Sequence, residues 1–84
     1  MEIPTAQEMF NRITEGLKQG LTVWICTATR QTKITPKVAK SWEDSGDKLF
    51  KVVKNDLYIA SGRKWNCLMA NDHLLVAIHI RDEG

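Results

Sequence analysis

The stretch Leu49–Ala60, LFKVVKNDLYIA, places Asn55 and Asp56 between two runs rich in β-branched and aromatic residues. Val, Ile, Tyr and Phe favour strands, and Asn and Asp tolerate the left-handed backbone of a tight turn. The stretch therefore predicts an antiparallel hairpin that turns at Asn55-Asp56. Two further strands are predicted after it, at 65–69 and 74–81.

Before this hairpin, Leu21–Cys26 is apolar and β-prone, and Thr27–Thr35 remains β-prone but becomes polar. The β-branched residues that favour strands continue through both segments. We therefore predict one long strand over 21–35, with a buried first half and an exposed second half.

Two helices complete the pattern. Thr5 and Glu8 have the spacing of a capping box, and Gly20 supplies a residue that readily ends a helix. Between them, apolar residues recur at helical spacing: Met9, Phe10, Ile13 and Leu17. Thr35-Pro36 has the pattern of a helix start and predicts a short second helix through about Trp42.

Together these elements predict one compact α+β domain over residues 1–84. It has an antiparallel sheet of four to five strands, an N-terminal amphipathic helix packed on one face, and a second short helix. The composition, 43% hydrophobic and 26% charged, is that of a globular protein. No 18-residue apolar run and no signal-peptide pattern occur. We expect a cytoplasmic protein with no membrane contact, in which Cys26 and Cys67 are free thiols.

The charge of the chain is uneven. The net charge is +2, but residues 25–65 carry nine Lys and Arg against four Asp and Glu. A basic middle flanked by mildly acidic ends gives the surface a polarity that attracts acidic partners. The distribution therefore predicts a protein or nucleoprotein target with an acidic surface, and nucleic acid remains an alternative.

The segment Ser61–Leu68, SGRKWNCL, is open to two interpretations. Gly62 marks either a hairpin turn or a bulge in a continuous strand. We expect Trp65 to lie in the core or at its edge, as most large aromatic side chains do. In the alternative, Arg63, Lys64 and Trp65 form an exposed tip, which Arg30 and Lys33 would extend into one basic patch if the two segments were neighbours in the sheet.

The sequence shows no pattern typical of an enzyme. Cys26, Cys67, His73 and His79 lack the close spacing of a structural zinc site. Neither a nucleophile elbow nor a phosphate-binding glycine loop is present. We expect no catalytic residue, no metal and no cofactor.

The best-supported expectation is a small stoichiometric binding protein, an inhibitor or adaptor that acts by surface complementarity, because Trp, Tyr and Arg dominate the energetics of interfaces. Trp42 either anchors such a surface or closes the core over the sheet edge. The alternatives are an RNA or single-stranded DNA binding module using segment 25–65, and an oligomer that binds a small molecule or nucleotide. In size and general character the chain resembles the small proteins of phages and mobile elements, many of which block host defence by binding alone. The predicted partner-binding residues are Arg30, Lys33, Lys37, Lys40, Trp42, Arg63, Lys64 and Trp65.

Overall fold

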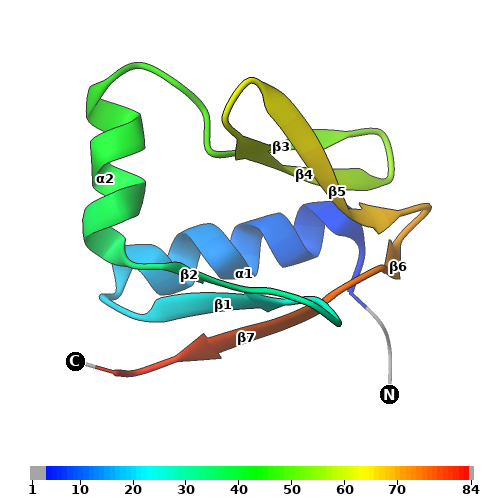
Figure 1. The fold of residues 1–84 in the computed structure, drawn as a ribbon, viewed down its shortest axis with the longest axis horizontal. Coiled ribbons are helices and arrows are strands. Elements are labelled where there is room, and N and C mark those ends of the chain that lie inside the picture. Colours follow the sequence, from blue (N-terminus) through cyan, green and yellow to red (C-terminus); the bar gives the residue numbers. More distant parts are fainter. Residues whose placement is uncertain (1–3, 84) are drawn as a thin grey trace.

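Two helices and seven strands follow one another in the computed structural model, which describes residues 4–83 (Figure 1). In chain order they are α1 (Ala6–Lys18), β1 (Thr22–Cys26), β2 (Gln31–Ile34), α2 (Pro36–Asp44), β3 (Phe50–Val53), β4 (Asp56–Ser61), β5 (Lys64–Ala70), β6 (His73–Leu74) and β7 (Ala77–Arg81). The α+β class, the N-terminal helix on a sheet and the second short helix are confirmed.

The strands form two antiparallel sheets, where the sequence predicted a single sheet of four to five strands. A three-stranded sheet has the order β2-β1-β7, and a four-stranded sheet has the order β3-β4-β5-β6. The predicted hairpin is present as β3 and β4, with a two-residue loop at Lys54-Asn55, one residue earlier than expected. Lys54 takes the left-handed conformation there, with φ +56°.

The long strand predicted over 21–35 is wrong. The chain reverses at Thr27–Arg30, and β2 returns alongside β1 with Val23 opposite Ile34. Thr27 holds this reversal: its backbone N–H donates to the Arg30 carbonyl at 2.7 Å, and its Oγ1 accepts from the Arg30 N–H at 3.0 Å. A threonine side chain therefore stabilises a turn that contains no glycine, asparagine or aspartate.

The strand predicted over 74–81 is divided between the two sheets. β6 pairs with the end of β5, whereas β7 pairs with β1. Leu75 lies at the crossing, where its N–H donates to the Leu68 carbonyl at 2.9 Å. The alternation of apolar residues is correct for Ile78 and Ile80, which pack against the core, but Leu74 is 41% exposed.

Local interactions fix α1 at both ends. Thr5 Oγ1 accepts from the Glu8 N–H at 3.1 Å and the Glu8 carboxylate accepts from the Thr5 N–H at 3.4 Å, so the predicted capping box is present. At the other end Gly20 has φ +87°, and the Leu21 N–H donates to the Gly16 carbonyl at 2.9 Å. This bond, with a second from Gly20 to Leu17, is the Schellman arrangement that ends many helices.

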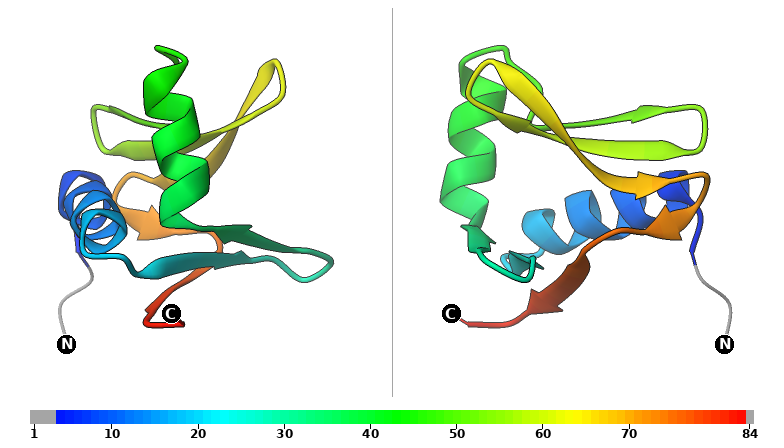
Figure 2. Two further views of the ribbon diagram at one scale, coloured as in Figure 1. Left: turned by 90° about the vertical axis from the view of Figure 1, so that its left-hand side faces the viewer. Right: turned by 45° about the vertical axis from the view of Figure 1, so that its right-hand side comes forward.

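The core lies around α1, which contacts both sheets (Figures 1 and 2). Its buried residues come from the helix (Met9 and Ile13 among them), from the three-stranded sheet (Val23, Ile25, Ile34) and from the four-stranded sheet (Leu57, Ile59, Leu68, Met69). Gly16 allows α1 to approach β7 closely, because a Cβ there would lie 2.9 Å from Cγ2 of Ile80. Within residues 4–83, no helix is long and apolar enough to cross a membrane.

Helix α2 stands upright at one end of the molecule, beyond one end of α1 (Figure 2). The Thr35 hydroxyl caps it by accepting from the Val38 N–H at 3.2 Å, and Pro36 occupies the first turn. None of its residues is buried. Since short helices depend on packing for stability, α2 is the least supported helix of the fold.

Candidate functional site

The β4–β5 hairpin answers the question that Ser61–Leu68 raised. Ser61 pairs with Lys64, and Gly62 has φ +61°, so this segment is a tight hairpin turn. Arg63 and Lys64 are both exposed at its tip. An irregularity in the ladder occurs elsewhere, between Leu57 and Tyr58.

The strand register decides what shares a face with this tip. Ala60 lies opposite Trp65, and Lys51, Tyr58 and Cys67 lie opposite one another on β3, β4 and β5. The other face of the same sheet carries Phe50 and Leu57, which are buried in the core. The face with Lys51, Tyr58 and Trp65 is therefore the outer one, turned away from the buried cluster.

Trp65 is 39% exposed, so the expectation that it belongs to the core is wrong. Its ring is covered on one side by Lys51, whose Nζ lies 4.3 Å from the ring centroid. The same ammonium lies 5.4 Å from the centroid of Tyr58. A cation held between two rings is attracted by both, and it keeps the indole in place at the surface.

Tyr58 is fixed by a neighbour on its own strand. Its hydroxyl donates to Oδ2 of Asp56 at 3.3 Å, and Oδ1 of the same carboxylate accepts from the Asn71 N–H at 3.0 Å. Desolvation, followed by the negative charge and hydrogen bond of Asp56 and by Cys67, raises the pKa of Tyr58 above its ordinary value. The phenol therefore remains neutral over the physiological range.

A cavity of about 270 Å³ joins this hairpin to the far end of α2. We name it the tryptophan pocket, because the indoles of Trp42 and Trp65 line it together with Asp47, Lys48, Arg63 and Lys64. Two tryptophans 23 positions apart in the sequence thus border one hollow. Trp42 is half-buried and packs against the core, so it both closes the core and contributes to the surface.

The tryptophan pocket brings together four of the eight predicted partner-binding residues. A fifth, Lys40, lines the neighbouring larger groove, and Lys37 is exposed on α2 but lines neither cavity. Arg30 and Lys33 belong to the β1–β2 hairpin of the other sheet. The two segments are not neighbours in one sheet, so the condition for a single basic patch of Arg30, Lys33 and Arg63 is not met.

Lys33 has its own environment on the three-stranded sheet. It pairs across the ladder with Trp24, and its Nζ lies 5.5 Å from that ring. The Glu83 carboxylate accepts from the Trp24 indole N–H and lies 3.6 Å from the Lys33 ammonium. The charge of Lys33 is thus largely satisfied within the molecule.

Two cations of this surface were not predicted: Lys48 and Lys51. Lys48 precedes a strand and had only its charge to distinguish it. The pairing of Lys51 with Tyr58 depends on the hairpin register, and a turn placed one residue later pairs Lys51 with Ala60 instead.

The remaining candidate chemistry is sparse. Cys26 and Cys67 are free and half-buried, and the Cys67 thiol donates to the Met69 carbonyl at 3.0 Å. Across residues 4–83 no three His, Cys, Asp or Glu side chains gather as a metal site would require.

In comparisons with known proteins, no family model matches the chain, and no curated protein or solved structure matches it. What the surface binds must therefore follow from the residues themselves.

Proposed function

We propose that this chain is a non-enzymatic binding protein, an inhibitor or adaptor that occupies an acidic surface of a larger protein or nucleoprotein complex. One observation carries the proposal: Trp42 and Trp65, brought from separate elements, line one hollow bordered by Lys48, Arg63 and Lys64. Interfaces owe most of their binding energy to a few aromatic and arginine side chains inside a polar rim.

Charge supports an acidic partner. The segment 48–74, which contains the whole four-stranded sheet, carries five Lys and Arg against two Asp. One of these carboxylates, Asp56, is engaged by Tyr58 and Asn71. The basic side chains therefore dominate the field at this end and would speed the approach of an anionic partner.

The weak packing of α2 also fits a binding role. The helix has no buried residue: its Val38 is exposed and its Trp42 is only half-buried. A partner seated on the tryptophan pocket would cover part of this helix and gain apolar contact area.

A second candidate function is binding of RNA or single-stranded DNA. Tyr58 and Trp65 share the outer face of an antiparallel sheet, with Arg63 and Lys64 at its edge. Single-strand binding proteins stack bases on such aromatic side chains and hold phosphates with cations. The rings here already hold Lys51 between them, so a base would have to use the remaining face of Trp65.

The two functions separate in one set of experiments. The tagged chain is used to capture proteins from nuclease-treated cell extract, in parallel with titration of fluorescent single-stranded DNA and RNA 20-mers at two salt concentrations. Recovery of one protein in fixed ratio supports the proposal, whereas salt-sensitive binding of the oligonucleotides alone supports the second candidate.

Matched variants locate the surface. Arg63→Ala with Lys64→Ala removes two cations at the pocket, and Arg30→Ala with Lys37→Ala removes two exposed cations outside it. The first pair should abolish capture and the second should leave it intact. Equal loss from both pairs would show that net charge, rather than this surface, drives binding.

We further propose that the protein acts in the cytoplasm, as the sequence predicts. The free thiols of Cys26 and Cys67 support a reducing compartment.

A further inference from the structure

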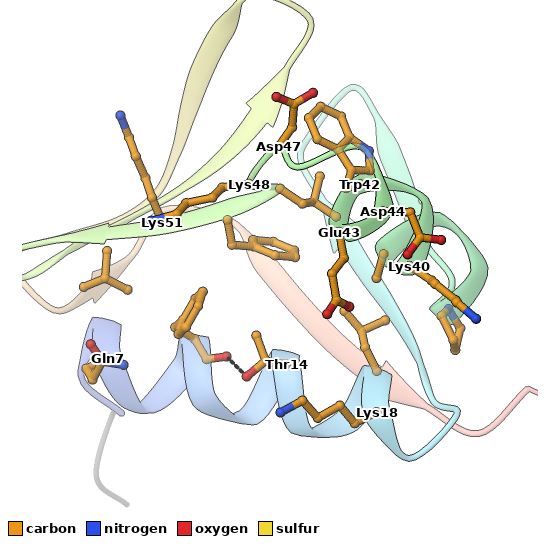
Figure 3. Close-up of a pocket in the computed structure, with 17 residues that line it drawn as sticks. Gln7, Thr14, Lys18, Lys40, Trp42, Glu43, Asp44, Asp47, Lys48 and Lys51 are labelled. Atoms are coloured by element: carbon orange, nitrogen blue, oxygen red, sulfur yellow. Dashed lines mark hydrogen bonds between the residues drawn. The ribbon is translucent and has the colours of Figure 1, made fainter.

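A second, larger groove lies next to the tryptophan pocket, between α1, α2 and β3 (Figure 3). We name it the α1–α2 groove. Its volume is about 820 Å³, and its apolar lining includes Phe10, Leu17, Ala39, Trp42, Phe50 and Val52. Trp42, Asp47 and Lys48 line both cavities, so the two hollows are neighbours.

The edge of a sheet borders this groove. β3 is the terminal strand of the four-stranded sheet, and Phe50, Lys51 and Val52 line the groove. The Ala60 N–H donates to the Leu49 carbonyl at 2.7 Å, which makes Leu49 one of the residues bonded to β4. Because bonding alternates along an antiparallel strand, the N–H and C=O groups of Phe50 and Val52 point to the open edge.

Charged side chains line the groove without pairing with an opposite charge among the described residues. Lys48 and Lys51 lie toward β3, and Glu43 and Asp44 project from α2 (Figure 3). None of these four side chains forms an ion pair with any residue in 4–83. Asp47 also lines the groove beside Lys48, and Lys18 and Lys40 line its helical side. The open strand itself contributes a cation, Lys51, and Lys48 lies two residues before the strand begins.

We propose that the α1–α2 groove binds an extended acidic segment of the partner protein, which adds as a strand to the edge of β3. The inference rests on the proposed binding function and names the chemistry of the contact. Main-chain hydrogen bonds form with Phe50 and Val52, and side chains of the segment alternate between two environments. Every second side chain is apolar and enters the groove beside Phe50, and those between are acidic and face Lys48 and Lys51.

An added strand would pair with the open backbone groups of β3, whereas a helical ligand would not. An open edge with unpaired backbone groups is a liability unless it is covered or paired, and β3 offers such an edge beside an apolar hollow. A helix in the groove would satisfy its own backbone and leave those of Phe50 and Val52 to water.

The test uses the whole chain and a synthetic probe, acetyl-Glu-Val-Glu-Val-Glu-Val-amide. Amide hydrogen exchange is followed by NMR with and without about 1 mM peptide, a concentration that half-saturates even a weak site. We expect Phe50 and Val52 amides to exchange rapidly in the free protein and to become protected with the peptide. The same peptide with N-methylated backbone, and a lysine analogue in place of glutamate, should give no protection.

Two variants keep the result independent of folding. Val52→Pro removes an N–H that the sheet does not use, so the fold should persist while protection and binding are lost. Lys48→Glu with Lys51→Glu should weaken peptide binding about tenfold without touching the backbone.

Several outcomes would overturn the inference. Amides of Phe50 and Val52 that are already protected at high dilution would show that the edge is closed within the chain, and protection that disappears on dilution would show that a second copy covers it. Amide exchange rates of Phe50 and Val52 that do not change when the peptide is added would also overturn the inference. A captured partner that is lost with the Arg63 and Lys64 variant but kept with Val52→Pro would refute strand addition while leaving the proposed function standing.

Discussion

The ammonium group of Lys51 lies over the indole of Trp65, 4.3 Å from the ring centroid, on the outer face of the four-stranded sheet. A lysine from β3 and a tryptophan from β5 meet across β4, with Tyr58 between them. This contact orders an exposed indole that would otherwise be free to rotate, and a surface side chain that is already ordered loses less entropy when a partner binds.

Replacing the cation tests the contact. Lys51→Gln should lower the free energy of unfolding by about 0.5–1 kcal/mol, since a cation above an indole at a partly exposed site contributes that much. Lys48→Gln is the matched control, because Lys48 contacts neither ring. Urea denaturation of the two variants gives the difference, and equal stabilities would show that the ring contact contributes nothing.

Gly16 permits α1 to approach β7, and adding one methyl group there tests that approach. Gly16→Ala should destabilise the protein by about 1 kcal/mol or more, because crowding against Ile80 outweighs the better helix propensity of alanine. In an Ile80→Ala background the sign should reverse, with alanine stabilising by a few tenths to about 1 kcal/mol. Thermal unfolding of the four proteins completes the cycle. Identical effects in both backgrounds would contradict the close contact.

Tyr58 is the only tyrosine of the chain, so tyrosinate absorbance reports its ionisation directly. Its pKa should lie above the ordinary value, and Asp56→Asn should lower it toward that value by removing the negative charge. The folded state holds the phenol proton more tightly than the unfolded chain. The associated stability is therefore complete below about pH 10 and is lost as pH rises through the folded-state pKa.

Comparison with Tyr58→Phe isolates this contribution from the other groups that titrate in alkali. The stability of the phenylalanine variant should fall less steeply over the same pH range. Parallel pH profiles for the two proteins would mean that Tyr58 ionises equally easily in both states.

The two threonine caps should differ in their effects. Thr5→Ala should lower global stability by about 1 kcal/mol, because it uncaps the helix around which the core is built. Thr35→Ala removes an equivalent cap from α2, which has no fully buried residue, so it should mainly speed local amide exchange in α2. Denaturation measures the first effect and hydrogen exchange the second. Equal global losses would show that α2 is part of the cooperative core.

Much of the fold follows from interactions between residues that are close together in the sequence. The capping residues and Gly20 define α1 through contacts within a few positions, so its ends could be predicted from the sequence. The reversal at Thr27–Arg30 could not, because a threonine hydroxyl replaces the usual turn residues. The division of the last strand depends on which sheet each half meets, a long-range property with no counterpart in the local pattern.

For the same reason, only part of the candidate site could be predicted from the sequence. Arg63 and Lys64 follow Gly62, and an exposed tip there was one of the two interpretations that the sequence left open. Whether Trp65 faced the core depended on which side of the sheet α1 covers, and its neighbour across the pocket, Trp42, comes from a helix that is distant in sequence. Alternation along one strand assigns residues to two faces but does not say which face is buried.

The short segment Leu75-Val76 connects the last strand of the four-stranded sheet to β7 of the three-stranded sheet. Trp42 lies on α2, which follows β2 of the three-stranded sheet almost directly. Trp65 belongs to the four-stranded sheet. Because Trp42 and Trp65 are carried by different sheets, the distance between the two indoles is set by the angle at which the sheets pack around their common core. A partner that fills the tryptophan pocket would therefore contact residues of both halves of the fold at once.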